Sequence, residues 1–401
     1  MISHIRRQYN GSFSQEKYRA FLQTLERAYG EAPNFRVAET PVFIPADLTA
    51  KFEEACIAIN DFLSSHQFDN IAHRAISLPD QLVPNEDQHS LFLQYDFGIA
   101  RNEAGELVPQ LIELQGFPSL YFYQHLLAQS FRRHFDIPAH MSHLAAKLDF
   151  YSYIELLRKV IVGDHNPKNV ILLEIEPEKQ VTRIDFWGAE QMLGIKVLCL
   201  SKLQRDGRNL YYLDDKGNKV AVHRIFNRVI FDELVLRQDL PRTFDFTQEV
   251  DVEWAGHPNW FMKISKYNMP YLDNPFVPKT YFLSDLEEYP EDLENYVLKP
   301  LFSFSGKGVL VDVTKADLDA VKDRSNFILQ RKIEFSPVIE TLDPAKPAKC
   351  EIRLMMIWEQ DAELPVLASN LVRMTKGKMA GARYNQNEEW VGATVGFFEH
   401  P

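Results

Sequence analysis

Small residues and lysines gather in one segment of this chain, between positions 296 and 313. Apolar runs at 296–298 and 309–313 flank a loop that begins near Ser303, and Lys299 follows the first run. The other loop residues that could contact a ligand are Ser305, Gly306, Lys307 and Gly308. Glycine and serine let backbone N–H groups approach phosphates, and lysine supplies positive charge. The pattern predicts two strands joined by a nucleotide-binding turn, and an ordinary glycine-rich hairpin is the alternative.

This loop differs from the common phosphate-binding motifs. Neither Gly-x-x-x-x-Gly-Lys-Ser/Thr nor Gly-x-Gly-x-x-Gly occurs in the sequence. The nucleotide hypothesis therefore depends on residues elsewhere in the chain.

Carboxylate and amide side chains mark the ends of two further expected strands, at 90–95 and 108–114. Asp96 ends the first strand, and Glu113 and Gln115 lie near the end of the second. Glu113 and Gln115 are two residues apart, so a strand would point both side chains to the same face. Oxygen ligands of this kind hold Mg²⁺ beside nucleotide phosphates. The strand pair is therefore a candidate metal site, and a solvated sheet face is the alternative.

Arginines lie at the ends of several expected strands. Arg353 belongs to the alternating segment 350–358, and Arg373 ends the strand at 366–373. Arg224 and Arg228 lie in the segment 223–228. Guanidinium groups suit a triphosphate, an acyl phosphate or a substrate carboxylate. The alternative is surface ion pairing of the strand arginines, with Glu351 as the nearby partner.

The composition argues against several function classes. The chain has 401 residues, 45% of them hydrophobic, and a formal net charge of −12 at pH 7. That charge disfavours binding to nucleic acid or to an anionic membrane. Cys56, Cys199 and Cys350 are scattered, which predicts buried thiols. No apolar run has a membrane-spanning length and the N-terminus lacks an apolar signal segment, so we expect a cytoplasmic protein.

The periodicity predicts an α+β fold in three regions. Residues 1–165 form a helix-rich region, with helices at 15–29, 48–65, 120–134 and 140–162 and the candidate metal hairpin at about 90–120. Residues 166–245 form a small α/β unit, with strands at 169–174 and 196–200, a helix at 182–193 and a hairpin at 210–222. Residues 246–401 form the nucleotide-binding region, with the glycine loop, a helix at 315–322 and strands at 326–331, 351–358 and 366–373.

Taken in order, these segments resemble a circularly permuted ATP-grasp protein, of the glutathionylspermidine synthetase-like and eukaryotic glutathione synthetase-like ligases. The resemblance covers about residues 74–395. The matching segments are Tyr95-Asp-Phe97, Glu113-Leu-Gln-Gly-Phe-Pro-Ser119, 223–232, Lys266-Tyr-Asn-Met-Pro-Tyr-Leu272, Val277-Pro-Lys279, Lys299-Pro300, 303–309, 328–333, Arg353 and Arg373. Gln115 departs from the family pattern, which has Asn there, and the glycine loop lacks an acidic residue that some relatives carry.

The resemblance implies a role for each candidate residue in a site for ATP and Mg²⁺. The implied nucleotide-binding residues are Lys266, Lys299, Ser305, Gly306, Lys307, Gly308, Gln330 and Lys332. The implied Mg²⁺ ligands are Asp96, Glu113 and Gln115. Arg353 and Arg373 would stabilise an acyl phosphate, and Arg224 or Arg228 would hold a substrate carboxylate. The resemblance also implies that the α/β unit at 166–245 is a Rossmann-like substrate domain.

The implied function is an ATP-dependent carboxylate–amine ligase that forms an amide through an acyl phosphate. Its expected partners are a small-molecule carboxylate and an amine, with no nucleic acid or membrane, and a homodimer is common for proteins of this size. Two alternatives stay open. One is a nucleotide- or partner-binding module with a weakened metal site, which Gln115 favours. The other is a small-molecule phosphotransferase on the same fold.

Overall fold

The computed structural model describes residues 1–76, 81–303, 306–377 and 388–400 of a mixed α/β protein. Its α-helices in these ranges are α1 (Ser3–Ser12), α2 (Gln15–Tyr29), α3 (Ala46–Leu63), α4 (His66–Ala72), α5 (Tyr121–His134), α6 (Phe150–Ile161), α7 (Arg183–Leu193), α8 (Phe231–Leu236), α9 (Trp260–Lys263) and α10 (Lys315–Asp319). A 3₁₀ helix, η6 (Lys266–Tyr271), follows α9. Within the described residues, no helix is long and apolar enough to span a bilayer.

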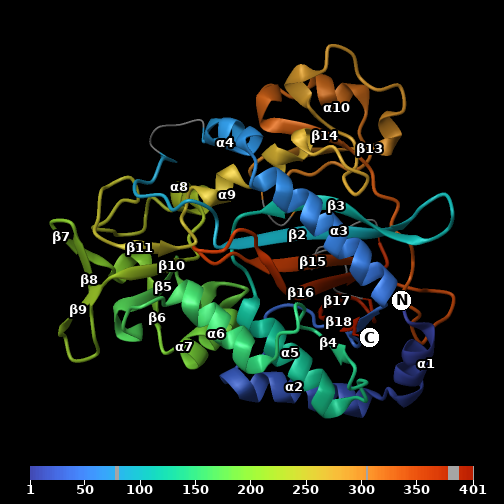
Figure 1. Ribbon diagram of the computed structural model, residues 1–401, viewed down its shortest axis with the longest axis horizontal. Helices are drawn as coiled ribbons and strands as arrows, with labels where there is room; N and C mark the ends of the chain where they lie inside the picture. Colours follow the sequence, from blue (N-terminus) through green and yellow to red (C-terminus); the bar gives the residue numbers. More distant parts are fainter. Residues whose placement is uncertain (77–80, 304–305, 378–387, 401) are drawn as a thin grey trace.

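A five-stranded antiparallel sheet lies at the centre of the molecule (Figure 1). Its strands in spatial order are β17 (Gly392–Thr394), β16 (Val366–Thr375), β15 (Lys349–Ile357), β2 (Phe92–Arg101) and β3 (Leu107–Gln115). The predicted strands at 90–95, 108–114, 351–358 and 366–373 are confirmed. Because β2 pairs with β15, segments from the two ends of the chain share one sheet.

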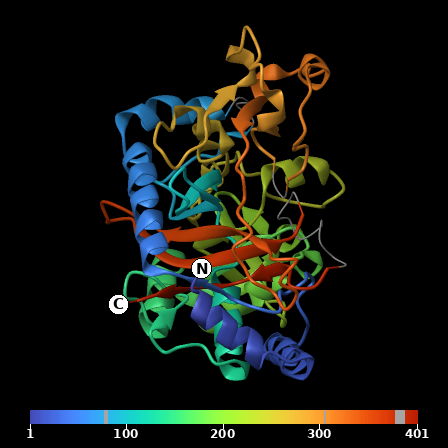
Figure 2. The ribbon, with the colours of Figure 1, turned by 90° about the vertical axis from the view of Figure 1, so that its right-hand side faces the viewer.

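Helix α3 covers one face of this sheet, as Figures 1 and 2 show. Tyr95 and Phe97 of β2 belong to the apolar core on that side, where Phe97 meets Phe52 of α3 edge to face at 5.6 Å. Side chains alternate along a strand, so Gln94 and Asp96 point to the opposite face. That face carries the candidate site.

A second, parallel sheet forms the α/β unit that the sequence predicts. Its strands in spatial order are β11 (Glu253–Ala255), β10 (Arg224–Asn227), β5 (Val170–Glu174) and β6 (Lys196–Cys199). The sheet therefore includes a strand beyond the boundary placed at 245. A small antiparallel sheet projects from this unit (Figure 1) and consists of β7 (Gln204–Asp206), β8 (Asn209–Leu213) and β9 (Lys219–Val222). Its β8–β9 hairpin confirms the one expected at 210–222.

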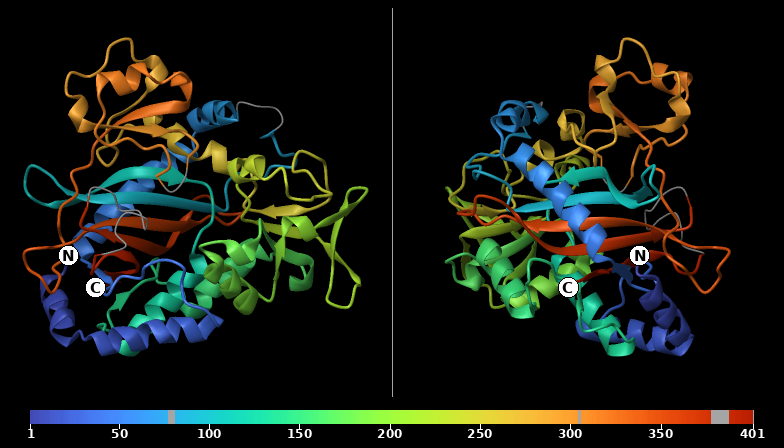
Figure 3. Two further views of the ribbon diagram at one scale, coloured as in Figure 1. Left: turned by 180° about the vertical axis from the view of Figure 1, so that it is seen from behind. Right: turned by 45° about the vertical axis from the view of Figure 1, so that its right-hand side comes forward.

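A small lobe stands on one side of the central sheet (Figure 3). It contains α10 and an antiparallel sheet of β12 (Thr280–Phe282), β14 (Phe327–Arg331) and β13 (Tyr296–Pro300). A remaining sheet, made of β1 (Val42–Ile44), β18 (Gly396–Glu399) and β4 (Met141–Ser142), joins the N-terminal and C-terminal segments.

Two predicted elements were wrong in part. The helix expected at 140–162 begins only at Phe150, because Ala146 and Lys147 have positive φ and Asp149 caps the helix through a 2.8 Å bond from the Ser152 N–H. The strand expected at 309–313 is reduced to a bridge. Only Leu310 exchanges backbone hydrogen bonds with Leu298, at 3.0 and 2.9 Å.

Candidate active site

A row of polar residues crosses the face of the central sheet opposite α3. In the strand register, Glu113 of β3 lies opposite Asp96 of β2, and Asp96 lies opposite Arg353 of β15. Arg373 of β16 lies opposite Glu351 of β15. Residues directly opposite each other in an antiparallel pair point to the same face. The register therefore brings together four residues that the sequence singled out separately.

Two arginines enclose the carboxylate of Asp96. Arg353 binds it bidentately, with Nε 2.5 Å from Oδ1 and Nη2 2.6 Å from Oδ2. Arg373 donates from Nη2 to the same Oδ2 at 2.6 Å and also to Glu351. Burial by itself raises the pKa of Asp96, but the two guanidinium charges outweigh it and hold that pKa below its usual range. Asp96 is therefore an ionised partner of two arginines.

Two buried lysines converge on the end of β3 from the small lobe and from η6. Lys299 of β13 is 7% exposed and donates from Nζ to the carbonyl oxygen of Ile112 at 2.9 Å and to Gln330 Oε1 at 2.5 Å. Lys266 is 5% exposed, and its Nζ lies 2.6 Å from the Ser303 carbonyl oxygen and 3.4 Å from Glu113 Oε2. The pKa of Lys299 is lowered to about 8, mainly by burial, while the Glu113 charge raises it and the Lys266 charge lowers it.

The charge at this point is incompletely balanced. Of the two lysines, Lys266 contacts a carboxylate, that of Glu113. The other hydrogen-bond acceptors of the two ammonium groups are neutral: the carbonyl oxygens of Ser303 and Ile112 and the side-chain amide of Gln330. A buried cation without a matching anion is costly. An anionic group bound here would restore the balance, so the donor set fits the phosphates of a nucleotide.

The expected Mg²⁺ ligands fit only in part. Glu113 and Gln115 lie at the end of β3, and the Glu113 side chain is 27% exposed. Asp96 is fully buried and already holds two guanidinium groups, so an ion could reach it only by displacing an arginine. Among the described residues, no group of three His, Cys, Asp or Glu side chains is arranged to hold a metal ion. A bound Mg²⁺ would therefore take Glu113 and Gln115 from the protein and the rest of its shell from phosphate and water.

The close approach of β3 to α9 requires Gly116. Its N–H donates to the Ile264 carbonyl oxygen at 2.9 Å, and a Cβ at this position would lie 2.8 Å from the Trp260 carbonyl oxygen. Glycine therefore lets the strand that carries Glu113 end beside the segment that carries Lys266.

The two arginines of the α/β unit have different surroundings. All three guanidinium nitrogens of Arg224 have partners, because it donates to the carbonyl oxygens of Val160 and Ile161 at 3.0 Å each and pairs with Glu253. It lies at the start of β10, and it does not join the polar row. Arg228 follows the carboxyl end of β10 and is 6% exposed, yet its Nε and Nη1 have no hydrogen-bond partner. Of the two, Arg228 has donors free for a substrate.

Glu174 faces Arg228 and was missed by the sequence reasoning. It ends β5, is 4% exposed and accepts a 2.7 Å bond from the Ile175 N–H. Burial raises its pKa to about 8, although the nearby Arg228 charge opposes the change. Ligands of open α/β sheets bind at the carboxyl ends of parallel strands, and that rule could have identified Glu174.

The glycine loop is described in part. Ser305 lies outside the described residues. Gly306 and Gly308 have φ of 70° and 75°, a region that favours glycine, and a Cβ on Gly308 would lie 2.9 Å from Pro300 Cγ. Lys307 is exposed. Lys332 points elsewhere, because its Nζ contacts the Glu294 carbonyl oxygen and Asp312 Oδ1, the latter at 3.3 Å.

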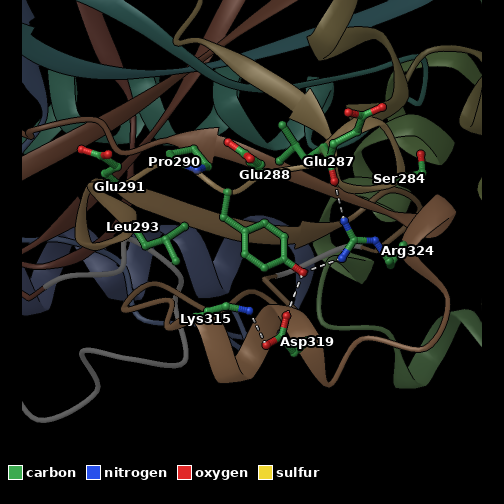
Figure 4. A pocket seen from close by; sticks show the side chains of 11 residues that line it. Ser284, Glu287, Glu288, Pro290, Glu291, Leu293, Lys315, Asp319 and Arg324 are labelled. Carbon is green, nitrogen blue, oxygen red and sulfur yellow. Dashed lines mark hydrogen bonds and ion pairs between the residues drawn. The ribbon is translucent and has the colours of Figure 1, made fainter.

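A cavity of about 780 Å³ lies within the small lobe, and neither Lys266 nor Lys299 lines it (Figure 4). Tyr289 lines it, and the Tyr289 hydroxyl accepts from Arg324 Nη1 at 2.5 Å and donates to Asp319 Oδ1 at 3.1 Å. None of the residues proposed from the sequence lines it. Arg324 donates to the Leu283 and Leu286 carbonyl oxygens as well, and Lys315 pairs with Asp319, so the cations that line this cavity already have partners and it is not the site we assign.

Comparison with known proteins places the fold. The chain matches no protein-family model and no curated protein. The apo structure of a glutathione synthetase-like effector from Globodera pallida matches it with a TM-score of 0.58 at 12% identity, over 97% of this chain and 98% of that chain. The fold is therefore similar to that of this glutathione synthetase-like effector. A gamma-glutamylcysteine synthetase candidate from Methylobacillus flagellatus KT shows a weaker likeness, with a TM-score of 0.39 at 12% identity over 84% of this chain and 83% of that chain.

The glutathione synthetase-like fold agrees with the ligase-type fold expected from the sequence, and it extends along nearly the whole chain. At this identity the likeness concerns the backbone alone. The roles of individual side chains must therefore be argued from the contacts described above.

Proposed function

We propose that this protein is an ATP-dependent carboxylate–amine ligase of the circularly permuted ATP-grasp type. The observation that carries the proposal is the pair of buried lysines, Lys266 and Lys299, which meet at the end of β3 with Glu113 as their carboxylate contact. A fold gains nothing from burying ammonium groups that it does not neutralise. Phosphates of a bound nucleotide would neutralise them.

The permuted order is supported by the central sheet. The hairpin β2–β3 precedes the small lobe in the chain, yet β2 pairs with β15, which follows that lobe. Strands that precede the small lobe in the chain and a strand that follows it thus belong to one sheet, and the two lysines lie at the end of β3 in that sheet.

Within this proposal, ATP supplies the phosphoryl group that activates a substrate carboxylate, and Mg²⁺ supplies positive charge at the phosphates. Lys299 and Lys266 hold the phosphate charge, and Glu113 with Gln115 holds the ion. Arg353 uses all three guanidinium nitrogens on Asp96 and Gln94, so it orients Asp96. Arg373 makes its contacts through Nη2 and its side chain is 25% exposed, so it can reach the acyl phosphate.

The substrate carboxylate belongs at Arg228. Two of its guanidinium N–H groups are unpaired and buried, which is costly unless a ligand accepts from them. A substrate carboxylate could accept a charge-assisted hydrogen bond from one of these nitrogens. Arg228 would hold the acid while the amine attacks.

The test measures ADP release from Mg·ATP. Carboxylic acids and amines from a panel are added separately and together. A ligase needs acid and amine together, a phosphotransferase needs one acceptor, and a binding module binds Mg·ATP without turnover. Glu113→Gln keeps the shape but removes the charge, and we expect it to lower turnover by at least a hundredfold. The control is Glu106→Gln, on the exposed turn of the same hairpin, which should leave turnover unchanged. Full activity of Glu113→Gln would contradict the assignment.

A further inference from the structure

Gln330 forms a bridge between the small lobe and the central sheet. It lies on β14 and is 2% exposed. Its Oε1 accepts from Lys299 Nζ at 2.5 Å, and its Nε2 donates to the Leu111 carbonyl oxygen of β3 at 3.2 Å. Both ends of the amide are thus engaged with protein groups.

A β-bulge makes the second acceptor for Lys299 available. Asp96 lies opposite Glu113 and the next residue, Phe97, lies opposite Leu111, so Ile112 has no partner on β2. A bulged residue leaves the hydrogen-bond ladder, which frees its carbonyl group for other donors. The Ile112 carbonyl oxygen accepts from Lys299 Nζ at 2.9 Å.

The two acceptors determine where the ammonium group points. An ammonium group has three donors in a tetrahedral arrangement. Gln330 and Ile112 take two of them, and the third has no acceptor among the described residues. Lys299 is therefore held as a fixed donor with one N–H left for a ligand.

We propose that Gln330 is a positioning residue, which fixes the Lys299 ammonium group against the bulge of β3 so that its third N–H meets a phosphate. This inference rests on the proposed function. It differs from the direct nucleotide contact that the family resemblance implies for Gln330, because the amide faces Lys299 and Leu111. It also assigns a purpose to the bulge, which places an acceptor one residue before Glu113.

A double-mutant cycle on Mg·ATP affinity separates positioning from direct contact. Calorimetry on the full chain compares the wild type, Gln330→Met, Lys299→Met and the double variant. Gln330→Met should weaken binding about tenfold, as expected for a disturbed charge-assisted bond, and less than twofold when Lys299 is already Met. An equal loss in both backgrounds would show that Gln330 contacts the nucleotide itself, and would overturn the proposal.

A second cycle needs no nucleotide, so it also decides the matter if the wild type fails to bind ATP and the proposed function is wrong. Gln330→Met should lower the urea midpoint of the wild type, because a buried ammonium group loses an acceptor. In the Lys299→Met background it should lower the midpoint less, because only the bond to the Leu111 carbonyl oxygen is then lost. The matched control is Gln124→Met, another fully buried glutamine, which should shift both backgrounds equally. Equal shifts for Gln330→Met would refute the bridge.

Discussion

At the scale of single residues, Lys299 shows the cost of keeping a charge inside the protein. Its folded-state pKa of about 8 lies below the usual value of 10.5, with burial as the main cause. The unfolded chain therefore binds the proton more tightly than the folded chain does. With respect to Lys299, the free energy of unfolding is highest above pH 10.5 and decreases as the pH falls towards 8. The decrease amounts to about 3 kcal/mol at neutral pH.

Lys299→Met should therefore stabilise the free protein by up to about 3 kcal/mol at pH 7 while it weakens nucleotide binding roughly ten- to a hundredfold. The gain should shrink as the pH rises from 8 to 10.5 and the wild-type lysine loses its proton. Urea unfolding at several pH values measures it. Lys216→Met, at an exposed hairpin turn, is the control and should show no such pH dependence. A destabilised Lys299→Met at pH 7 would mean that the lysine is structural.

At the scale of secondary structure elements, one buried carboxylate holds the start of α5. Asp185 of α7 accepts hydrogen bonds from the backbone N–H groups of Leu120, Phe122 and Tyr123 at 3.1, 2.8 and 2.8 Å. Leu120 has φ of 65°, a left-handed conformation that a leucine rarely adopts. The cap therefore comes from another helix and also holds the segment between Gln115 and α5 in place.

Asp185→Ala should destabilise the protein by about 2–3 kcal/mol, because it leaves buried N–H groups without an acceptor. Asp149→Ala removes the exposed cap of α6 and should cost about 1 kcal/mol. Urea unfolding of the two variants gives the comparison, and Asp185→Asn, which retains one acceptor oxygen, should fall between them. Similar losses for both alanine variants would show that burial does not strengthen the cap.

At the scale of the whole molecule, the central sheet unites regions that the sequence separated. The boundaries predicted at 165 and 245 assign β2 and β3 to one region and β15 to another, but these strands lie side by side. Cys350 and Ile352 of β15 are fully buried in the same core as Tyr95 and Phe97. Region 246–401 would therefore expose a strand edge and half a core if it were produced alone.

We expect a fragment of residues 246–401 to remain unfolded or to aggregate by itself, and to fold when it is co-expressed with residues 1–245. Circular dichroism and hydrogen exchange measure this, with the slowest exchange in β2 and β15 of the complex. A fragment with cooperative unfolding of its own would contradict the shared core.

Local patterns in the sequence were sufficient to predict most of the helices and strands. The β8–β9 hairpin follows from Asp214-Asp-Lys-Gly217, where Gly217 has φ of 81°. An apolar run predicted β2, alternation predicted β15, and the spacing of Glu113 and Gln115 placed them on one face. These features depend on residues close in the chain, so a single sequence contains them.

Contacts between distant segments were decided by the tertiary structure. The sequence proposed Asp96 as a metal ligand, but pairing of β2 with β15 and β16 surrounds its carboxylate with Arg353 and Arg373. Arg224 and Arg228 look alike in the sequence. In the structure Arg224 donates to neighbouring carbonyl oxygens, whereas Nε and Nη1 of Arg228 have no hydrogen-bond partner. A side chain's charge partners and burial depend on strand register and packing across the molecule, which local sequence patterns do not specify.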